Sequence, residues 1–390
     1  AGHAQTPFPA AAARISFGVT AASIPSLIEH DKRDPSAHHR TVKRPQAGGA
    51  GVSRQRVIFV LPCSQRSPHR PERVQSGSMR VILANPRGFC AGVRMAIQVV
   101  DEVLRAKGPP IYVFHEIVHN KHVVDDFRSR GVVFVETIDE VPNGHIVVFS
   151  AHGVSPAVRK AAAGRQLQAV DATCPLVTKV HNEVVRYARD GYHIIFIGHR
   201  DHQEAVGTVG EAPGHITVVE AAEEVPSLQL PQSQRLAYVT QTTLSVTDAQ
   251  RVIDALKARF PQIKAPPKDD ICYATTNRQE AVSVIAPEAD LVLVVGSKNS
   301  SNSNRLVDRA KDAGSAAHLI DDASELRPEW FAGVKSVLVT AGASAPDHLV
   351  DNLLRKLTDD YGATVETRTL VEEDISFSLP KSARELVVLK

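Results

Sequence analysis

Three cysteines stand far apart in the chain, each in a polar segment or one bounded by Pro or Gly. Cys90 lies in NPRGFCAG, Cys174 in VDATCPLV and Cys272 in DDICYATT. Each interval between them is close to the length of a small α/β unit, so we expect three units to bring one thiol each to a common centre.

The spacing alone leaves three kinds of chemistry open for these cysteines. A lone cysteine is usually a small buried apolar side chain. Structural zinc sites usually draw paired ligands from Cys-x-x-Cys, which the sequence lacks. A cubane iron–sulfur cluster normally takes four thiolates, so three would leave one iron open as a Lewis acid for a substrate oxygen.

Polar side chains that suit an anion follow several apolar segments. Imidazole, hydroxyl and amide donors, together with backbone N–H groups of helix N-termini, bind phosphate oxygens. Neither a Walker loop nor G-x-G-x-x-G is present, which favours a small diphosphate over a nucleotide. The candidates are His119, His152, Ser300, Ser301, Asn302 and Ser344.

Glu204 is the candidate proton donor. It follows His202 by two residues in a loop after an apolar segment, where the ordinary reading is a solvated carboxylate. In a buried site its pKa would rise, and it could then act as an acid. Thr242 is expected to orient it or a bound water.

The elements that must position these residues follow from the apolar pattern. Continuous apolar segments, each followed by a polar loop, predict strands at 80–84, 111–114, 145–149, 193–197, 236–239, 291–295 and 337–339. Helical periodicity predicts helices over 96–106 and through 123–127, the second ending at Gly131. This is an α/β pattern with parallel sheets, and ligands bind such sheets at the carboxyl ends of the strands.

The bulk composition is that of a globular protein without a general affinity for nucleic acid or membranes. The 390 residues are 43% hydrophobic and 23% charged, with a net charge of +2. Four cysteines in a chain of this length fit a reducing compartment. Residues 1–78 are basic and lack a long periodic pattern, so we expect a disordered extension, the alternative being a transit peptide. We therefore exclude Cys63 from the site.

Seven motifs together closely resemble the family of 4-hydroxy-3-methylbut-2-enyl diphosphate reductases, of bacterial type. They lie at 85–92, 115–120, 150–155, 171–181, 240–245, 269–281 and 296–305. The resemblance implies three similar parallel-sheet α/β domains in a trefoil around a central [4Fe–4S] cluster. The expected boundaries are 1–78 for the extension, 79–91 for a strand and cluster loop beside the third domain, 92–174, 175–271 and 272–378 for the domains, and 379–390 for a tail.

The resemblance also implies roles for single residues. Cys90, Cys174 and Cys272 would hold the cluster and leave one iron open. Around the substrate would lie His119, His152, His202, Thr242, Ser300, Ser301, Asn302 and Ser344, mostly at its diphosphate. Glu204 would deliver a proton, with Thr242 beside it.

The implied reaction is the reductive dehydroxylation of the allylic diphosphate to isopentenyl and dimethylallyl diphosphate, the last step of the methylerythritol phosphate route. A ferredoxin- or flavodoxin-like protein would supply the electrons, in the bacterial cytoplasm. Two other hypotheses stay open: a zinc- or iron-bearing diphosphate-binding protein without redox turnover, and a non-redox cluster dehydratase.

The chain departs from the family pattern near Glu204. Gln203 stands where Pro is usual and Asp201 where Gly is common, while Ala205-Val206 replaces Val-Glu and Arg94-Met95 replaces a pair ending in Arg. Without Pro, φ at position 203 is less restricted, so we expect a looser loop and a changed rate rather than lost activity.

Overall fold

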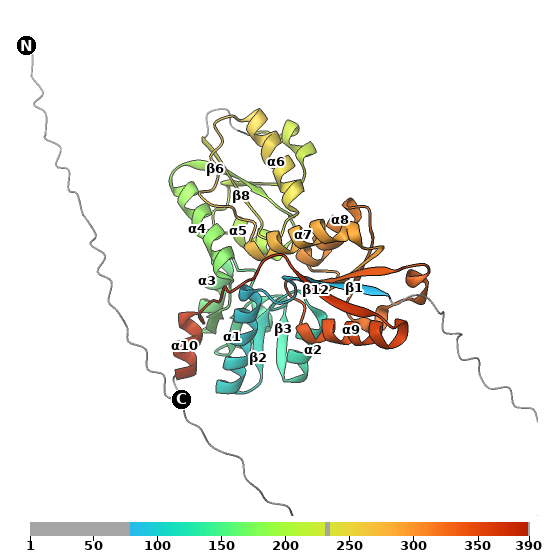
Figure 1. The fold of residues 1–390 in the computed structure, drawn as a ribbon. Helices are drawn as coiled ribbons and strands as arrows, with labels where there is room; N and C mark the ends of the chain where they lie inside the picture. Colours follow the sequence, from blue (N-terminus) through green and yellow to red (C-terminus); the bar gives the residue numbers. More distant parts are fainter. Residues whose placement is uncertain (1–78, 231–234, 389–390) are drawn as a thin grey trace, which may run out of the picture. The chain divides into compact units, whose positions relative to one another are not determined.

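The computed structural model describes residues 79–230 and 235–388, which form three all-parallel β-sheets covered by helices (Figure 1). The α/β class expected from the sequence is confirmed. In this described part, none of the helices has the length and apolar character needed to cross a bilayer. The predictions for residues 1–78, including that for Cys63, lie outside it.

Two of the sheets are formed by consecutive parts of the chain. The first has the order β3 (Val132–Val135), β2 (Ile111–Phe114), β4 (Ile146–Phe149) and β5 (Gln168–Asp171), with helices α1 (Ala91–Lys107), α2 (Lys121–Ser129) and α3 (Pro156–Gly164). The second has the order β7 (Ile216–Val219), β6 (Tyr192–Ile197) and β8 (Arg235–Thr240), with α4 (Pro175–Arg189), α5 (Gln203–Val209) and α6 (Val246–Arg259).

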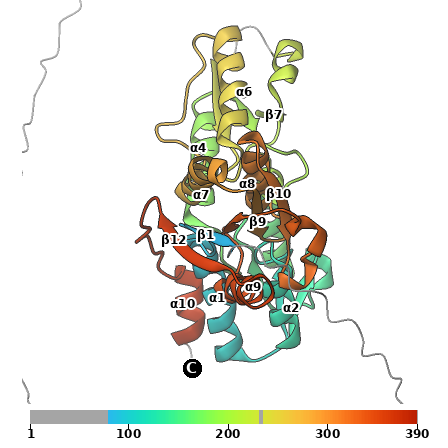
Figure 2. The same ribbon diagram turned by 45° about the vertical axis from the view of Figure 1, so that its right-hand side comes forward.

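The third sheet joins the start of the described chain to its last third. Its order is β10 (Ala316–Ile320), β9 (Leu291–Val295), β11 (Ser336–Ala341), β1 (Arg80–Asn85) and β12 (Thr364–Thr369). Its helices are α7 (Tyr273–Ile285), α8 (Ser301–Asp312) and α9 (Asp347–Tyr361), seen around the sheet in Figure 2. Val81 of β1 pairs with Val337 on one side and Val365 on the other, so the first described strand lies inside this sheet.

Continuous apolar segments form the central strands because both faces of the sheets are covered. In β9, Leu291, Leu293 and Val295 belong to one apolar cluster, while Val292 and Val294 belong to the cluster on the opposite face. All five are buried. Each strand that the pattern missed lies at a sheet edge, and most of β12, for example, is exposed. Edge strands need fewer apolar residues, so β12 carries a weaker signal, whereas β3 is apolar throughout and was missed despite its pattern.

Helix α1 begins five residues earlier than expected, directly after Cys90. Periodicity of the apolar residues first becomes regular near Ala96, whereas the helix starts where Cys90 serves as N-cap. The last helix, α10 (Lys381–Val388), lies beside α1 in both ribbon views, and its Ala383 is buried in the apolar cluster around α1. The C-terminal segment therefore returns from the third sheet to the first.

Candidate active site

The three predicted cysteine ligands are the N-cap residues of three helices. Cys90 precedes α1, Cys174 precedes α4 and Cys272 precedes α7. A Cβ atom on Gly92 would lie 2.6 Å from Sγ of Cys174 and 3.9 Å from Sγ of Cys90, so both thiols lie against this glycine. Cys272 interacts electrostatically with the other two. The structure thus places the thiols of Cys90 and Cys174 together, with Cys272 near enough to act on the pKa of Cys174, and Gly92 leaves room for the Cys174 thiol.

The thiols of Cys174 and Cys272 hold their protons strongly in this environment. Burial raises the pKa of Cys174 to about 12 and that of Cys272 to about 11, and the neighbouring Cys90 acts in the same direction. Helix N-termini favour thiolates, but here burial has the larger effect. A bound cationic group would be needed to ionise Cys174 and Cys272 near neutral pH. In the described part of the chain, no three His, Cys, Asp or Glu side chains are placed to hold a single metal ion.

Each cysteine is tied by its backbone to a loop that carries a predicted substrate residue. The Cys90 N–H donates to the carbonyl of Ala343 at 3.1 Å, next to Ser344. The Cys174 N–H donates to Ala151 at 3.0 Å, next to His152, and the Cys272 N–H donates to Thr242 at 3.0 Å. Displacement of one of these loops would therefore move a thiol.

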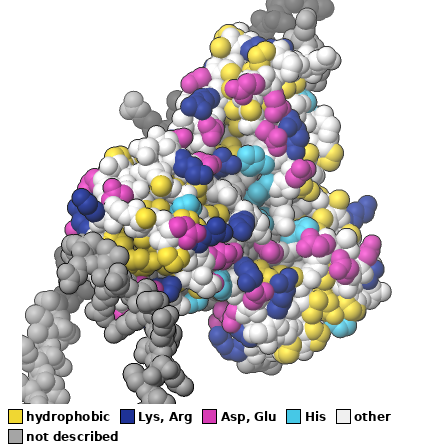
Figure 3. All heavy atoms as spheres, turned by 90° about the vertical axis from the view of Figure 1, so that its right-hand side faces the viewer, with side chains coloured by type: hydrophobic (Ala, Val, Ile, Leu, Met, Phe, Trp, Pro, Cys, Tyr) yellow, Lys and Arg dark blue, Asp and Glu magenta, His cyan; other side chains and the backbone are white. Residues whose placement is uncertain are grey.

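Three histidines from two sheets form a cluster. The His119 ring stacks on that of His152 with centroids 4.1 Å apart, and His202 meets them edge-on at 5.5 and 5.8 Å. They follow β2, β4 and β6 respectively, so the carboxyl ends of these strands converge as expected. Histidine side chains lie among Lys and Arg side chains near the middle of the face in Figure 3.

Burial keeps two of these imidazoles neutral. It lowers the pKa of His202 to about 3 and that of His152 well below its ordinary value, and the neighbouring imidazoles add to both effects. Gln203 acts weakly in the opposite direction on His152. Because each imidazole disfavours charge on the next, a bound anion would be the natural stabiliser of their protonated forms.

Polar neighbours fix the orientation of His119. Its Nδ1 donates to Glu116 Oε2 at 3.2 Å, and the amide of Asn299 donates to the same oxygen at 2.7 Å. The bond from His119 lowers the pKa of Glu116. The Ser344 hydroxyl donates to the His119 carbonyl at 2.8 Å. Sequence reasoning missed Glu116 and Asn299, although both stand within motifs that it had singled out.

Residues 300–302 lie where α8 begins, beyond the carboxyl end of the inner strand β9 of the third sheet. Ser300 is the N-cap of α8, and its oxygen accepts from the Ser303 N–H at 3.3 Å. A Cβ atom on either Gly296 or Gly342 would lie within 2.2 Å of the Ser303 hydroxyl oxygen. These two strand-end glycines therefore let the start of α8 approach the sheet.

Ser301 and Asn302 connect this helix to the other loops of the site. The Ser301 hydroxyl donates to the Thr243 carbonyl at 3.0 Å. The Asn302 amide donates to Thr275 at 3.1 Å, and its oxygen accepts from the Ala343 N–H at 2.9 Å. Asn302 thus bridges the Cys272 helix and the loop of Ser344, a structural contact that sequence reasoning did not anticipate.

Glu204 is a buried carboxyl group held by one residue. Its Oε1 accepts from the Thr242 N–H at 2.7 Å and its Oε2 from the Thr242 hydroxyl at 2.9 Å. Burial raises the pKa of Glu204 to about 7, against the lowering effect of the Thr242 bonds. Gln203 is the first residue of α5 and His202 its N-cap, with Nδ1 accepting from the Glu204 N–H at 3.1 Å. A proline at 203 would also fit this helix start.

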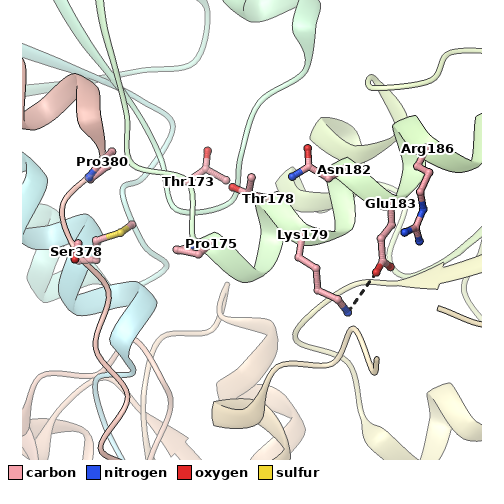
Figure 4. Close-up of a pocket in the computed structure, with 10 residues that line it drawn as sticks. Thr173, Pro175, Thr178, Lys179, Asn182, Glu183, Arg186, Ser378 and Pro380 are labelled. Carbon is pink, nitrogen blue, oxygen red and sulfur yellow. Dashed lines mark ion pairs between the residues drawn. The ribbon is translucent and has the colours of Figure 1, made fainter. Parts of the chain in front are cut away.

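A cavity of about 640 Å³ lies beside the Cys174 loop, away from the histidine cluster. Thr173 and Pro175, the neighbours of Cys174, line it together with Lys179 of α4. Figure 4 shows Ser378 and Pro380 of the C-terminal segment on the side opposite α4. This cavity contains none of the predicted substrate residues, so its size does not identify the reaction site.

Comparisons with known proteins show which family this chain resembles. A family model described as LytB protein matches residues 81–358. The 4-hydroxy-3-methylbut-2-enyl diphosphate reductase of Rhodopirellula baltica is 55% identical over 306 residues, spanning 78% of this chain and 96% of the relative. That of Azotobacter vinelandii is 57% identical over 310 residues, spanning 78% and 98%.

A solved structure supports the same relationship. The E-1-hydroxy-2-methyl-but-2-enyl-4-diphosphate reductase from Plasmodium falciparum superimposes with a TM-score of 0.78 and 39% identity, covering 80% of this chain and 99% of that one. The resemblance found in the sequence motifs is confirmed, and the chain belongs to the LytB protein family.

Proposed function

We infer that this chain is a 4-hydroxy-3-methylbut-2-enyl diphosphate reductase, which removes the allylic hydroxyl group and forms isopentenyl and dimethylallyl diphosphate. The observation that carries this function is the convergence of three thiols, a histidine cluster and one buried acid at the carboxyl ends of the strands. The reaction consumes two electrons and two protons. One proton leaves in the water formed, and the other ends on carbon.

The three cysteines suit an iron–sulfur cluster better than a zinc ion. All three are helix N-caps, where the helix dipole favours an anionic group. The thiols come from three separate segments rather than from Cys-x-x-Cys pairs, which structural zinc sites usually use. We assign Cys90, Cys174 and Cys272 as ligands of one [4Fe–4S] cluster with one open iron. When bound, such a cluster supplies electrons and a Lewis-acidic position.

The histidine cluster and the start of α8 are assigned to the diphosphate. His119, His152 and His202 offer ring N–H donors, and burial disfavours charge on His152 and His202 unless an anion lies beside them. Ser300, Ser301, Asn302 and Ser344 lie at the ends of β9 and β11, beside the backbone N–H groups of α8. The hydroxyl of Ser344 now donates to a carbonyl, so we expect it to rotate when it binds a phosphate oxygen.

Glu204 and Thr242 are assigned to proton delivery. Hydroxide is a poor leaving group, so a proton must reach the departing oxygen. A pKa of about 7 keeps about half of the Glu204 carboxyls protonated near neutral pH. Thr242 holds both carboxyl oxygens and fixes the direction in which the acid faces.

The electron donor is proposed to be a ferredoxin- or flavodoxin-like protein of the bacterial cytoplasm, because such proteins deliver low-potential electrons one at a time. A reducing compartment would also keep the three thiols available for iron.

Anaerobic purification and a single assay test the proposal. The protein should be brown, with iron and sulfide in cluster proportion, and should convert the hydroxylated allylic diphosphate to both products when a chemical reductant is present. Loss of water from the substrate without reductant, which would leave a conjugated diene diphosphate rather than either product, would instead indicate a non-redox dehydratase. A colourless zinc protein that binds the diphosphate without turnover would contradict the reductase.

A further inference from the structure

Arg278 of α7 is a fully buried cation that joins two of the cysteine-bearing segments. Its side chain is 1% exposed. Its Nη2 donates to the carbonyl of Gly88 at 2.8 Å, and its Nε donates to the same oxygen at 3.2 Å. Gly88 lies two residues before Cys90, whereas α7 begins at Cys272. Arg278 therefore sets the position of the Cys90 loop relative to the Cys272 helix.

The charge of Arg278 is matched by a residue of the C-terminal segment. Both carboxylate oxygens of Glu373 accept from the guanidinium, at 3.0 to 3.3 Å, and Asn277 donates to one of them at 3.0 Å. Glu373 is 14% exposed. The pair is bidentate, a geometry that arginine provides and lysine does not.

Residues 370–388, here called the C-terminal strap, also reach the other cysteine-bearing elements. After Glu373, the strap passes along one side of the cavity beside Cys174, where Figure 4 shows Ser378 and Pro380 facing α4. Its helix α10 packs on α1, which starts at Cys90, and on β5. The Ser382 hydroxyl accepts from the N–H of Asp171, three residues before Cys174.

We propose that Arg278 and Glu373 form a latch through which the C-terminal strap positions the Cys90 loop, so that retention of the cluster depends on the strap. The inference rests on the proposed cluster ligands. Arg278 and Glu373 are positioning residues, since they act through the backbone of the loop rather than on substrate. Outer partners that orient metal ligands typically contribute 10- to 100-fold to metal affinity.

The test uses Glu373→Gln in the full chain, loaded with its cluster under anaerobic conditions. Glutamine keeps the shape but leaves the buried guanidinium without its counter-charge. Glu288→Gln is the matched control, because Glu288 forms half-exposed ion pairs with Arg80 and Arg368 in the same sheet unit. Both variants lose one negative charge.

Cluster loss to a chelator, followed by absorbance, should be on the order of tenfold faster in Glu373→Gln and unchanged in Glu288→Gln. Hydrogen exchange of the peptide containing residues 86–91 should also be faster in Glu373→Gln, whereas the strands of the second sheet, residues 192–197 and 235–240, should exchange at the wild-type rate. Arg278→Lys should also lose its cluster faster than the wild type, because lysine cannot form the bidentate pair. The rate in Glu373→Asp should fall between those of the wild type and Glu373→Gln. Should Glu373→Gln not fold, Glu373→Asp provides the same comparison at smaller amplitude.

A Glu373→Gln protein that loses its cluster at the wild-type rate would overturn the latch, as would an equal acceleration in Glu288→Gln. Failure of the underlying assignment is recognised separately. If Cys272→Ser keeps normal iron, the proposed ligands are wrong. If Cys272→Ser loses iron while Glu373→Gln retains it, only the latch is wrong.

Discussion

Substitution of Glu204 by glutamine removes the acidic proton of this residue and keeps the size and shape of its side chain. Glu204 is 2% exposed, and both of its oxygens accept from Thr242. A glutamine of the same size can still accept from the Thr242 N–H, while its NH₂ group donates to the Thr242 hydroxyl. The variant should therefore keep the local structure and lose only the acidic proton.

The raised pKa gives the size and sign of the effect on stability. A pKa of about 7 in place of 4.5 means that ionisation of Glu204 costs the folded protein about 3 kcal/mol. The folded state binds this proton more tightly than the unfolded state, so wild-type stability should fall as pH rises from 4.5 to 7. Glutamine does not ionise. Glu204→Gln should therefore match the wild type near pH 4.5 and be more stable by up to about 3 kcal/mol above pH 7.

Turnover should change in the opposite direction. Loss of a positioned acid typically lowers the rate by about 10²–10⁴-fold, and the loss should appear in kcat with KM little changed. In the wild type, kcat should fall above pH 7, since about a tenth of the acid is protonated at pH 8. The assay follows product formation anaerobically with a chemical reductant, with exposed Glu223→Gln as control. Near-wild-type turnover in Glu204→Gln, or an unchanged pH profile, would refute the assignment.

Four further outcomes are expected. Serine at Cys90, Cys174 or Cys272 should lower the iron content, whereas Cys63→Ser should not; normal iron in Cys272→Ser contradicts three-ligand binding. His152→Ala and Asn302→Ala should each raise KM roughly tenfold or more, because a lost donor to a charged oxygen costs about 1.5–3 kcal/mol; unchanged affinity in both would exclude these residues from the diphosphate site. Binding of the diphosphate should be accompanied by proton uptake and should strengthen as pH falls, since an anion raises the lowered pKa values of His152 and His202; calorimetry in two buffers of different ionisation enthalpy would detect this. A chain starting at Met79 should keep fold and activity, as β1 begins at Arg80, and loss of activity would show a role for residues 1–78.

Central strands could be predicted from the sequence because burial on two faces leaves a continuous apolar signal. The segment 291–295 is such a case, with alternate residues in clusters on opposite faces of the sheet. Polar residues directly after these strands could be predicted to converge, since parallel strands end at the same edge. His119 and His152 follow neighbouring strands β2 and β4, and their rings stack. Edge strands such as β12 carry no comparable signal.

Contacts between segments far apart in the chain leave no local pattern at all. Arg278 reads as an ordinary helical arginine, and its partners Gly88 and Glu373 lie 190 and 95 residues away along the chain. Gly92 reads as a weak helix former, yet it is the residue that leaves room for the thiol of Cys174. Such residues are required because segments far apart in the chain come close together in the fold. A short stretch of one sequence carries no sign of that approach. Gly88 and Gly92 each lie two residues from Cys90, and Arg278 lies in the helix of which Cys272 is the N-cap. These residues therefore fix the segments that carry the thiols, and their position in the fold explains a role that no local pattern shows.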